Sequence, residues 1–277
     1  MLRIGCVKYL NARPLIRGWP GEVDFDHPSA LCKRLADGEL DVALVSSFEF
    51  LRNPIYRIVD DVSISSYGPV YSVVVAHRGN VSDIKEIELD PASQTAANLL
   101  RCLLAERGVK PRLIRNIDFQ SVRPAGLEPA VQGAAEDVSA GHTGNTPMFR
   151  SRLLIGDQAI RFRQEQARAF QFWDLSEQWK KVTDLPFAYA LWLIRPEVAD
   201  AKTVANRLRA LRNENLANLD ELILAETEFD HQFCIRYYRE HLRFSFGEEE
   251  KEGLKTFANL CAKHGLLEKC DLKFDLV

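Results

Sequence analysis

The sequence predicts an α/β protein whose two lobes enclose a ligand cleft. Three observations predict this fold. Short β-type runs alternate with helical patterns in the first half of the chain, as in parallel α/β structure. Two long apolar strands, at residues 71–76 and 185–194, bracket the middle of the sequence. Beyond Arg195 the apolar residues recur at helical spacing. A chain that leaves one lobe, builds a second and returns has this order.

The first α/β unit occupies the N-terminal 46 residues. Residues 2–7 and 23–26 are β-type runs, and residues 28–37 have helical spacing with Gly38 placed to end the helix. Residues 41–46 form a buried strand with a polar end. Strand, helix and strand in this order indicate parallel pairing.

A second unit of the same kind follows. A β-branched strand at residues 71–76 precedes strands at 86–90 and 112–115, and the helix expected between the last two covers 93–107. Gly108 is well placed to end that helix. The repeated order supports a second sheet.

The region from about 120 to 150 breaks this rhythm. It is rich in Gly, Pro, Ala, Ser and Thr, and a loop of this length is either a mobile surface insertion or functional. A strand is expected at 152–157, and Ser245 and Glu248 form an expected capping box before the last helix.

We therefore expect two lobes, the first discontinuous in sequence. Lobe I comprises residues 1–76 and 190–277, and lobe II comprises residues 77–189 with the irregular insertion at about 120–150. Two crossover strands join them. A monomer is the default expectation for such a form.

Composition excludes several classes of protein. The chain has 277 residues, 46% hydrophobic and 27% charged, which is enough to bury a core and excludes a disordered protein. Its net charge of −3 argues against a nucleic-acid binder. No run of about 18 apolar residues occurs, so no membrane span is expected. Lys8 and Asn11 interrupt the N-terminal apolar run, which argues against an export signal and predicts a cytoplasmic protein.

Motifs for metal, nucleotide or nucleophile chemistry are missing. Among six cysteines, Cys6, Cys32, Cys102 and Cys261 lie in apolar segments, and no C-x-x-C pair occurs, which favours reduced thiols over disulfides or zinc. The six histidines form no ligand motif. No G-x-G-x-x-G, Walker or G-x-S-x-G sequence is present.

Several segments in fixed order nevertheless resemble one family. Each is weak alone, and as an ordered set they are specific. They are IGCVKYLNARPL at 4–15, GELDVALVS at 38–46, GPVYSV at 68–73, LIGD at 154–157 with TDLPF at 183–187, and the C-terminal YYRE at 237–240, GEEEKEG at 247–253 and GLL at 265–267. The sequence resembles the menaquinone-biosynthesis family that contains chorismate dehydratase, of the futalosine pathway, over most of its length outside about 120–150.

The resemblance implies a periplasmic-binding-protein type II fold. It also implies a carbon–oxygen lyase that removes water from chorismate to give 3-[(1-carboxyvinyl)oxy]benzoate, without a metal or organic cofactor. Two alternatives stay open: a non-catalytic small-carboxylate-binding protein, and the related naphthoate-forming step, 1,4-dihydroxy-6-naphthoate synthase. The Tyr-Leu-Asn start favours the dehydratase over the latter.

Two residues are the catalytic candidates. By the resemblance, Asn11 lies in the cleft and orients the substrate or polarises the leaving hydroxyl, although Asn is also a common turn residue. Ser72 contacts a substrate carboxylate by the same argument, or is simply satisfied within the sheet.

Five further residues are candidates for substrate binding. Ser46 ends a strand, where ligands bind in open α/β sheets, and Ser93 and Thr95 begin a helix whose N-terminus suits a carboxylate. For all three, ordinary helix capping is the alternative. The family often has Ser-x-Thr-Ser here, whereas this chain has Ala96 in the last place.

Arg13 and Asp157 complete the set of candidate residues. Arg13 is either a carboxylate-binding Arg or a solvated turn residue. Asp157 bonds a substrate hydroxyl or holds a hinge turn, and repulsion from a dianion favours the structural or closure role. No general base stands out, so we hypothesise that a substrate carboxylate accepts the proton.

Overall fold

The computed structural model describes residues 2–90, 92–115, 150–269 and 271–277. Residues 120–149 of the expected insertion lie outside this part of the chain, so that interpretation stays a prediction.

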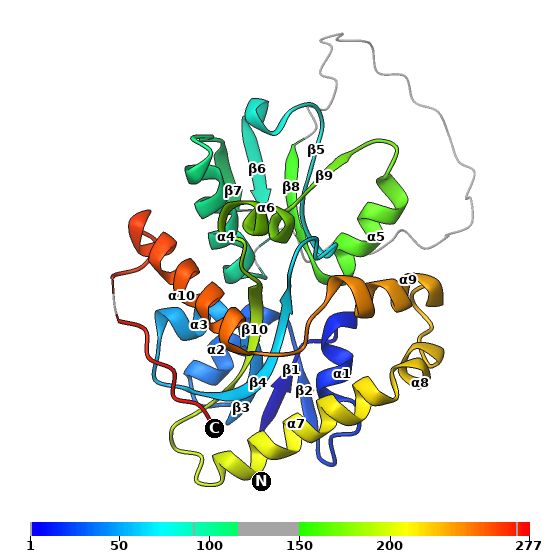
Figure 1. Ribbon diagram of the computed structural model, residues 1–277, viewed down its shortest axis with the longest axis vertical. Helices are drawn as coiled ribbons and strands as arrows, with labels where there is room; N and C mark the ends of the chain where they lie inside the picture. Colours follow the sequence, from blue (N-terminus) through cyan, green and yellow to red (C-terminus); the bar gives the residue numbers. More distant parts are fainter. Residues whose placement is uncertain (1, 91, 116–149, 270) are drawn as a thin grey trace, which may run out of the picture.

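The first sheet forms the lower half of the molecule in Figure 1 and has the strand order β2-β1-β3-β10-β4. Its strands are β1 (Ile4–Cys6), β2 (Val23–Phe25), β3 (Val42–Ser46), β4 (Arg57–Ser66) and β10 (Phe187–Ile194). β1 pairs in parallel with β2 and β3, as the first α/β unit predicts. The late strand β10 enters antiparallel between β3 and β4.

The second sheet forms the upper half and has the order β7-β6-β8-β5-β9. Its strands are β5 (Val73–His77), β6 (Glu86–Leu89), β7 (Arg112–Arg115), β8 (Ser151–Ile155) and β9 (Gln171–Asp174). β6 pairs in parallel with β7 and β8, whereas β5 runs antiparallel between β8 and β9. We call the parts built on the first and second sheets lobe I and lobe II.

This strand pairing corrects the expected lobe boundaries. β5 belongs to the second sheet, so residues 73–76 lie in lobe II, and the start of β10, at 187–189, lies in lobe I. Both strands are largely buried apolar runs, and such runs give no local sign of their partners. We propose that the lobes join near residues 67–72 and 184–186.

Helices cover both sheets. They are α1 (Arg13–Ile16), α2 (Pro28–Ala36), α3 (Ser47–Arg52), α4 (Gln94–Glu106), α5 (Gly156–Gln166), α6 (Leu175–Thr183), α7 (Ala201–Ala217), α8 (Leu219–Leu224), α9 (His231–Arg236) and α10 (Glu248–Lys263). Short 3₁₀ turns η1 (Leu10–Ala12) and η2 (Val81–Asp83) and a π-helical turn η4 (Tyr237–His241) complete the elements used below. α10 contacts both β10 of lobe I and α4 of lobe II.

Most expected elements are confirmed, and two details are wrong. The strand expected at 152–157 ends at Ile155, because Gly156 takes a left-handed φ of +58° and starts α5. The cap of α10 is Gly247, whose N–H donates to Glu250 Oε2 at 2.9 Å, so the capping box at Ser245 and Glu248 is wrong. The missed strand β4 is long but carries several polar residues.

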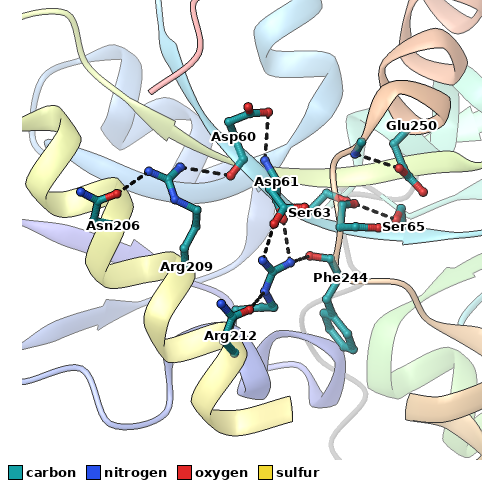
Figure 2. Close-up of polar contacts among 12 residues, drawn as sticks. Asp60, Asp61, Ser63, Ser65, Asn206, Arg209, Arg212, Phe244 and Glu250 are labelled. Carbon is teal, nitrogen blue, oxygen red and sulfur yellow. Dashed lines mark hydrogen bonds and ion pairs between the residues drawn. The ribbon is translucent and has the colours of Figure 1, made fainter. Parts of the chain in front are cut away.

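The edge strand β4 is covered by two distant chain segments. Ile58 N–H donates to Asp275 O at 2.7 Å, and Ser65 N–H donates to Arg243 O at 2.9 Å. Arg212, on α7, fixes this edge with four hydrogen bonds: to Asp61 O, Asp61 Oδ2, Phe244 O and Asn213 Oδ1 (Figure 2). Arg209 donates to the carbonyls of Asp60 and Val277 beside it. We call these contacts the arginine network.

The described cysteines are buried. Cys6, Cys32, Cys102, Cys234 and Cys261 are free thiols, as the apolar surroundings of most of them predict. The Sγ atoms of Cys102 and Cys261 lie 3.7 Å apart, between α4 and α10.

Candidate functional site

A pocket of about 70 Å³ lies between the two lobes. Both sheets contribute to its wall, which is lined by Val7, Tyr9, Asn11, Pro28, Leu44, Val45, Ser46, Ile64, Val70, Ser72, Val73, Ser93, Ile155, Gly156, Tyr189 and Ala190. Four predicted site residues therefore meet here: Asn11, Ser46, Ser72 and Ser93.

The pocket is neutral. No charged side chain of the described residues lines it. Instead, three helices begin at its wall: α3 after Ser46, α4 after Ser93 and α5 after Ile155. Helix N-termini carry a partial positive charge, which favours anions. The pocket is therefore suited to a carboxylate without an arginine in its wall.

Asn11 lies on the turn η1, which lobe II holds in place. Leu10 N–H donates to Asp157 Oδ1 at 2.8 Å, and Tyr238 Oη donates to Leu10 O at 2.8 Å. Hydrogen bonds thus hold both the N–H and the C=O of Leu10, the residue before Asn11. The buried Asn11 Oδ1 has no hydrogen-bond partner among the described residues. A buried acceptor without a partner costs free energy, which a ligand hydroxyl would offset.

Ser72 follows a strained residue and is fully buried. Tyr71 adopts φ +68°, a conformation that L-residues with bulky side chains rarely take. The Asp174 carboxylate holds this conformation by accepting the N–H groups of Val70 and Tyr71 at 3.1 and 2.8 Å. Gly156 N–H donates to Ser72 O at 2.8 Å. Several separate contacts therefore fix the position of Ser72.

Tyr237 contacts the catalytic candidate Ser72, although the sequence alone gave Tyr237 no role. Its hydroxyl donates to Ser72 Oγ at 2.7 Å. Burial raises the pKa of Tyr237 far above its ordinary value, which keeps the phenol protonated. The YYRE segment of the resemblance was the only sign of it.

Ser46 and Thr95 join the lobes, whereas Ser93 caps a helix of lobe II. Thr95 Oγ1 accepts the N–H of Phe48 at 3.0 Å and hydrogen-bonds to Ser46 Oγ, which itself accepts the N–H of Thr95 at 3.1 Å. Ser93 caps α4 by accepting Ala96 N–H at 3.1 Å. The capping alternative thus applies to Ser93. Thr95 does not line the pocket and instead links α4 to α3.

Arg13 and Asp157 also lie outside the pocket wall. Arg13 forms an ion pair with the buried Glu226 and lines a separate hollow with Lys8 and Glu228. Burial raises the pKa of Asp157 to about 6, with the Leu10 N–H and Arg13 acting in the opposite direction. Asp157 connects α5 to η1 through the Leu10 N–H, and its expected structural or closure role stays a prediction.

The described part of the chain contains no group of three or more His, Cys, Asp or Glu that is arranged to hold a metal ion. Within the same residues, no helix is long and apolar enough to cross a membrane.

The fold is that of the periplasmic binding proteins. An Archaeoglobus fulgidus protein of known structure aligns over 96% of this chain and 98% of its own, with a TM-score of 0.68 and 17% identity. The periplasmic aliphatic sulphonate-binding protein of Escherichia coli aligns over 99% and 94%, with a TM-score of 0.58 and 13% identity. The expected fold class is confirmed.

The chain belongs to the menaquinone biosynthesis family, whose sequence model matches residues 2–134 and 145–263. It is 30% identical over 275 residues to a protein of Thermus thermophilus named chorismate dehydratase, covering 92% of this chain and 93% of that one. The family resemblance seen in the sequence is therefore confirmed.

Proposed function

We propose that this protein is a chorismate dehydratase of menaquinone biosynthesis by the futalosine route. It would act as a hydro-lyase that converts chorismate to 3-[(1-carboxyvinyl)oxy]benzoate. The similarity to the Thermus thermophilus protein along almost the whole chain supports this assignment.

One observation carries the proposal. The segments that resemble the family lie far apart in sequence, yet four of them contribute to one pocket, through Asn11, Ser46, Ser72 and Gly156. A family resemblance due to the fold alone would spread over the core. Its convergence on the wall of a single pocket supports a shared ligand.

The pocket chemistry suits chorismate, which has two carboxylates and a ring hydroxyl. Helix N-termini and hydroxyl donors favour the carboxylates, and Asn11 Oδ1 is a free acceptor for the ring hydroxyl. Removal of the C3 proton and the C4 hydroxyl makes the ring aromatic. The protein has mainly to orient the substrate and support the charge that develops.

The proton acceptor in our proposal is a carboxylate of the substrate. Neither a carboxylate nor a histidine lines the pocket among the described residues. A carboxylate held near the ring by Ser72 and the helix N-termini would have the proximity that an intramolecular base needs. We further propose a cytoplasmic protein that uses a small-molecule substrate without a metal or organic cofactor, with a monomer as the default state.

The test is incubation of the purified protein with chorismate, followed by mass spectrometry for loss of one water and for the aromatic product. Boiled protein controls for spontaneous decay of chorismate. Product that depends on active protein supports the dehydratase. Chorismate binding without product would instead favour a small-carboxylate-binding protein. If neither product formation nor chorismate binding is observed, other substrates have to be tested, including that of the naphthoate-forming enzyme.

The variants Asn11→Ala and Ser72→Ala test the site itself. We expect each to lower kcat about 100-fold, because loss of a positioned hydrogen-bonding group costs about 100- to 1,000-fold in pre-organised sites. Ser65→Ala is the matched control, since Ser65 is equally buried but bonds to Arg243 O and Ser245 O outside the pocket. Near-normal kcat in both pocket variants would refute the assignment of these residues.

A further inference from the structure

Tyr237 lies behind the pocket, where its hydroxyl hydrogen-bonds to Ser72. Its ring is fully buried and stacks on the ring of Phe233, with 5.4 Å between the ring centroids. The phenol does not line the pocket, so it touches no ligand there directly. An effect of Tyr237 on a ligand can therefore pass through Ser72.

The hydrogen-bonding capacity of these groups fixes their orientation. A phenol has one proton, and that of Tyr237 is donated to Ser72 Oγ at 2.7 Å. Tyr237 therefore acts on the pocket wall as a hydrogen-bond donor to Ser72.

The same reasoning applies to Ser72. Its Oγ accepts the Tyr237 proton, and no second partner of Ser72 Oγ occurs in the described part of the chain. A serine hydroxyl has one proton of its own, which is thereby directed away from Tyr237. The pocket lies on that side, because Ser72 lines it.

We infer that Tyr237 is a positioning residue, which turns the Ser72 hydroxyl proton toward the substrate. Ser72 then presents a donor, which suits a carboxylate. This inference rests on the proposed dehydratase function for the identity of the substrate.

The test is the variant Tyr237→Phe, which removes one oxygen and keeps the ring contacts. We expect kcat to fall about 10- to 100-fold, since small misplacements of reacting groups cost up to about 100-fold, while KM changes less. Tyr56→Phe is the matched control: Tyr56 is also fully buried, but its hydroxyl bonds to Asn53 outside the pocket. Thermal unfolding of both variants checks that they fold.

A double-variant cycle separates positioning from general support. If Tyr237 acts through Ser72, the variant carrying both Tyr237→Phe and Ser72→Ala is no slower than Ser72→Ala alone. A wild-type kcat in Tyr237→Phe, or two effects that multiply in the double variant, would overturn the inference while leaving the dehydratase intact.

The cycle also has a readout that does not need turnover. Calorimetric titration with chorismate should give the same affinity in the double variant as in Ser72→Ala alone, although Tyr237→Phe by itself lowers the affinity. If the wild type binds chorismate without converting it, the proposed function fails and this equality still tests the inference. If chorismate does not bind at all, both proposals are overturned for this substrate.

Discussion

Two buried polar networks differ in whether they leave a hydrogen-bond acceptor without a partner. Around the pocket, Tyr237 joins Ser72 through neutral hydroxyl groups, and Asn11 Oδ1 in the same pocket wall keeps no partner among the described residues. At the edge of the first sheet, the arginine network uses charge, and Arg212 makes four hydrogen bonds to α7, β4 and the segment at Phe244 (Figure 2).

The comparison separates binding from scaffolding. A network whose donors and acceptors are all used stabilises one arrangement of the chain. A network that keeps an unused acceptor beside a pocket gives up some of that stability, and a ligand can complete it. Perturbation of the arginine network should therefore reduce stability, whereas perturbation of the pocket network should reduce activity.

The largest effect is expected for Arg212→Ala. The change removes the Arg212 donor from the Asp61 carbonyl and one of the two donors to the Phe244 carbonyl, and loss of a buried charged partner costs about 3 to 4 kcal/mol of unfolding free energy. Urea unfolding measures this cost, and kcat of the folded fraction should stay within about twofold.

Arg239→Ala is the control, because Arg239 and its partner Asp220 are both more than half exposed. Such surface pairs contribute about 0 to 1 kcal/mol. An equal loss in the two variants would mean that burial of the arginine network has no special importance.

The next effect concerns Asp157, a carboxylate beside the neutral network. Burial raises its pKa from 3.8 to about 6, so its ionised form is disfavoured in the folded state. The contribution of Asp157 to the unfolding free energy of the wild type is fully present below pH 3.8 and is lost as the pH rises through about 6. Asp157→Asn should thus gain stability relative to wild type between pH 4.5 and 7.5, by up to about 3 kcal/mol.

Asp41→Asn gives the opposite sign as a control. A hydrogen bond from Arg3 lowers the pKa of Asp41, so that carboxylate stabilises the fold near neutral pH and less in acid. Urea unfolding across the pH range compares both variants with wild type. A stability difference for Asp157→Asn that does not change with pH would show that Asp157 ionises freely in the folded protein.

The smallest effect is expected for Gly156→Ala. Gly156 has φ +58°, where a residue with a Cβ costs about 1 to 2 kcal/mol, and that Cβ would lie 2.9 Å from the Tyr9 ring. Gly108→Ala isolates the backbone cost, since φ is +68° there and the surroundings are open. A loss of stability or chorismate affinity in Gly156→Ala beyond that in Gly108→Ala measures the cost of the contact between the new Cβ and the Tyr9 ring. Equal losses would mean that Tyr9 moves aside freely.

Local patterns predicted much of this fold. Alternation of β-type runs and helical spacing located β1, α2, β3, β6, α4 and β7 to within about two residues, because such patterns depend on neighbours along the chain. The family resemblance also selected Asn11, Ser46, Ser72 and Ser93, which line one pocket.

Tertiary contacts decided the rest. Nothing local distinguishes a buried strand of one sheet from that of the other, so β5 was assigned to the wrong lobe. Arg13 forms an ion pair with Glu226, and Thr95 hydrogen-bonds to groups of α3, and both contacts join distant segments of the chain. Tyr237 lies 165 residues from Ser72. The sequence by itself determined which side chains are available, and only the packing of the two lobes decided which of them meet, because hydrogen-bond partners are fixed by distance in space.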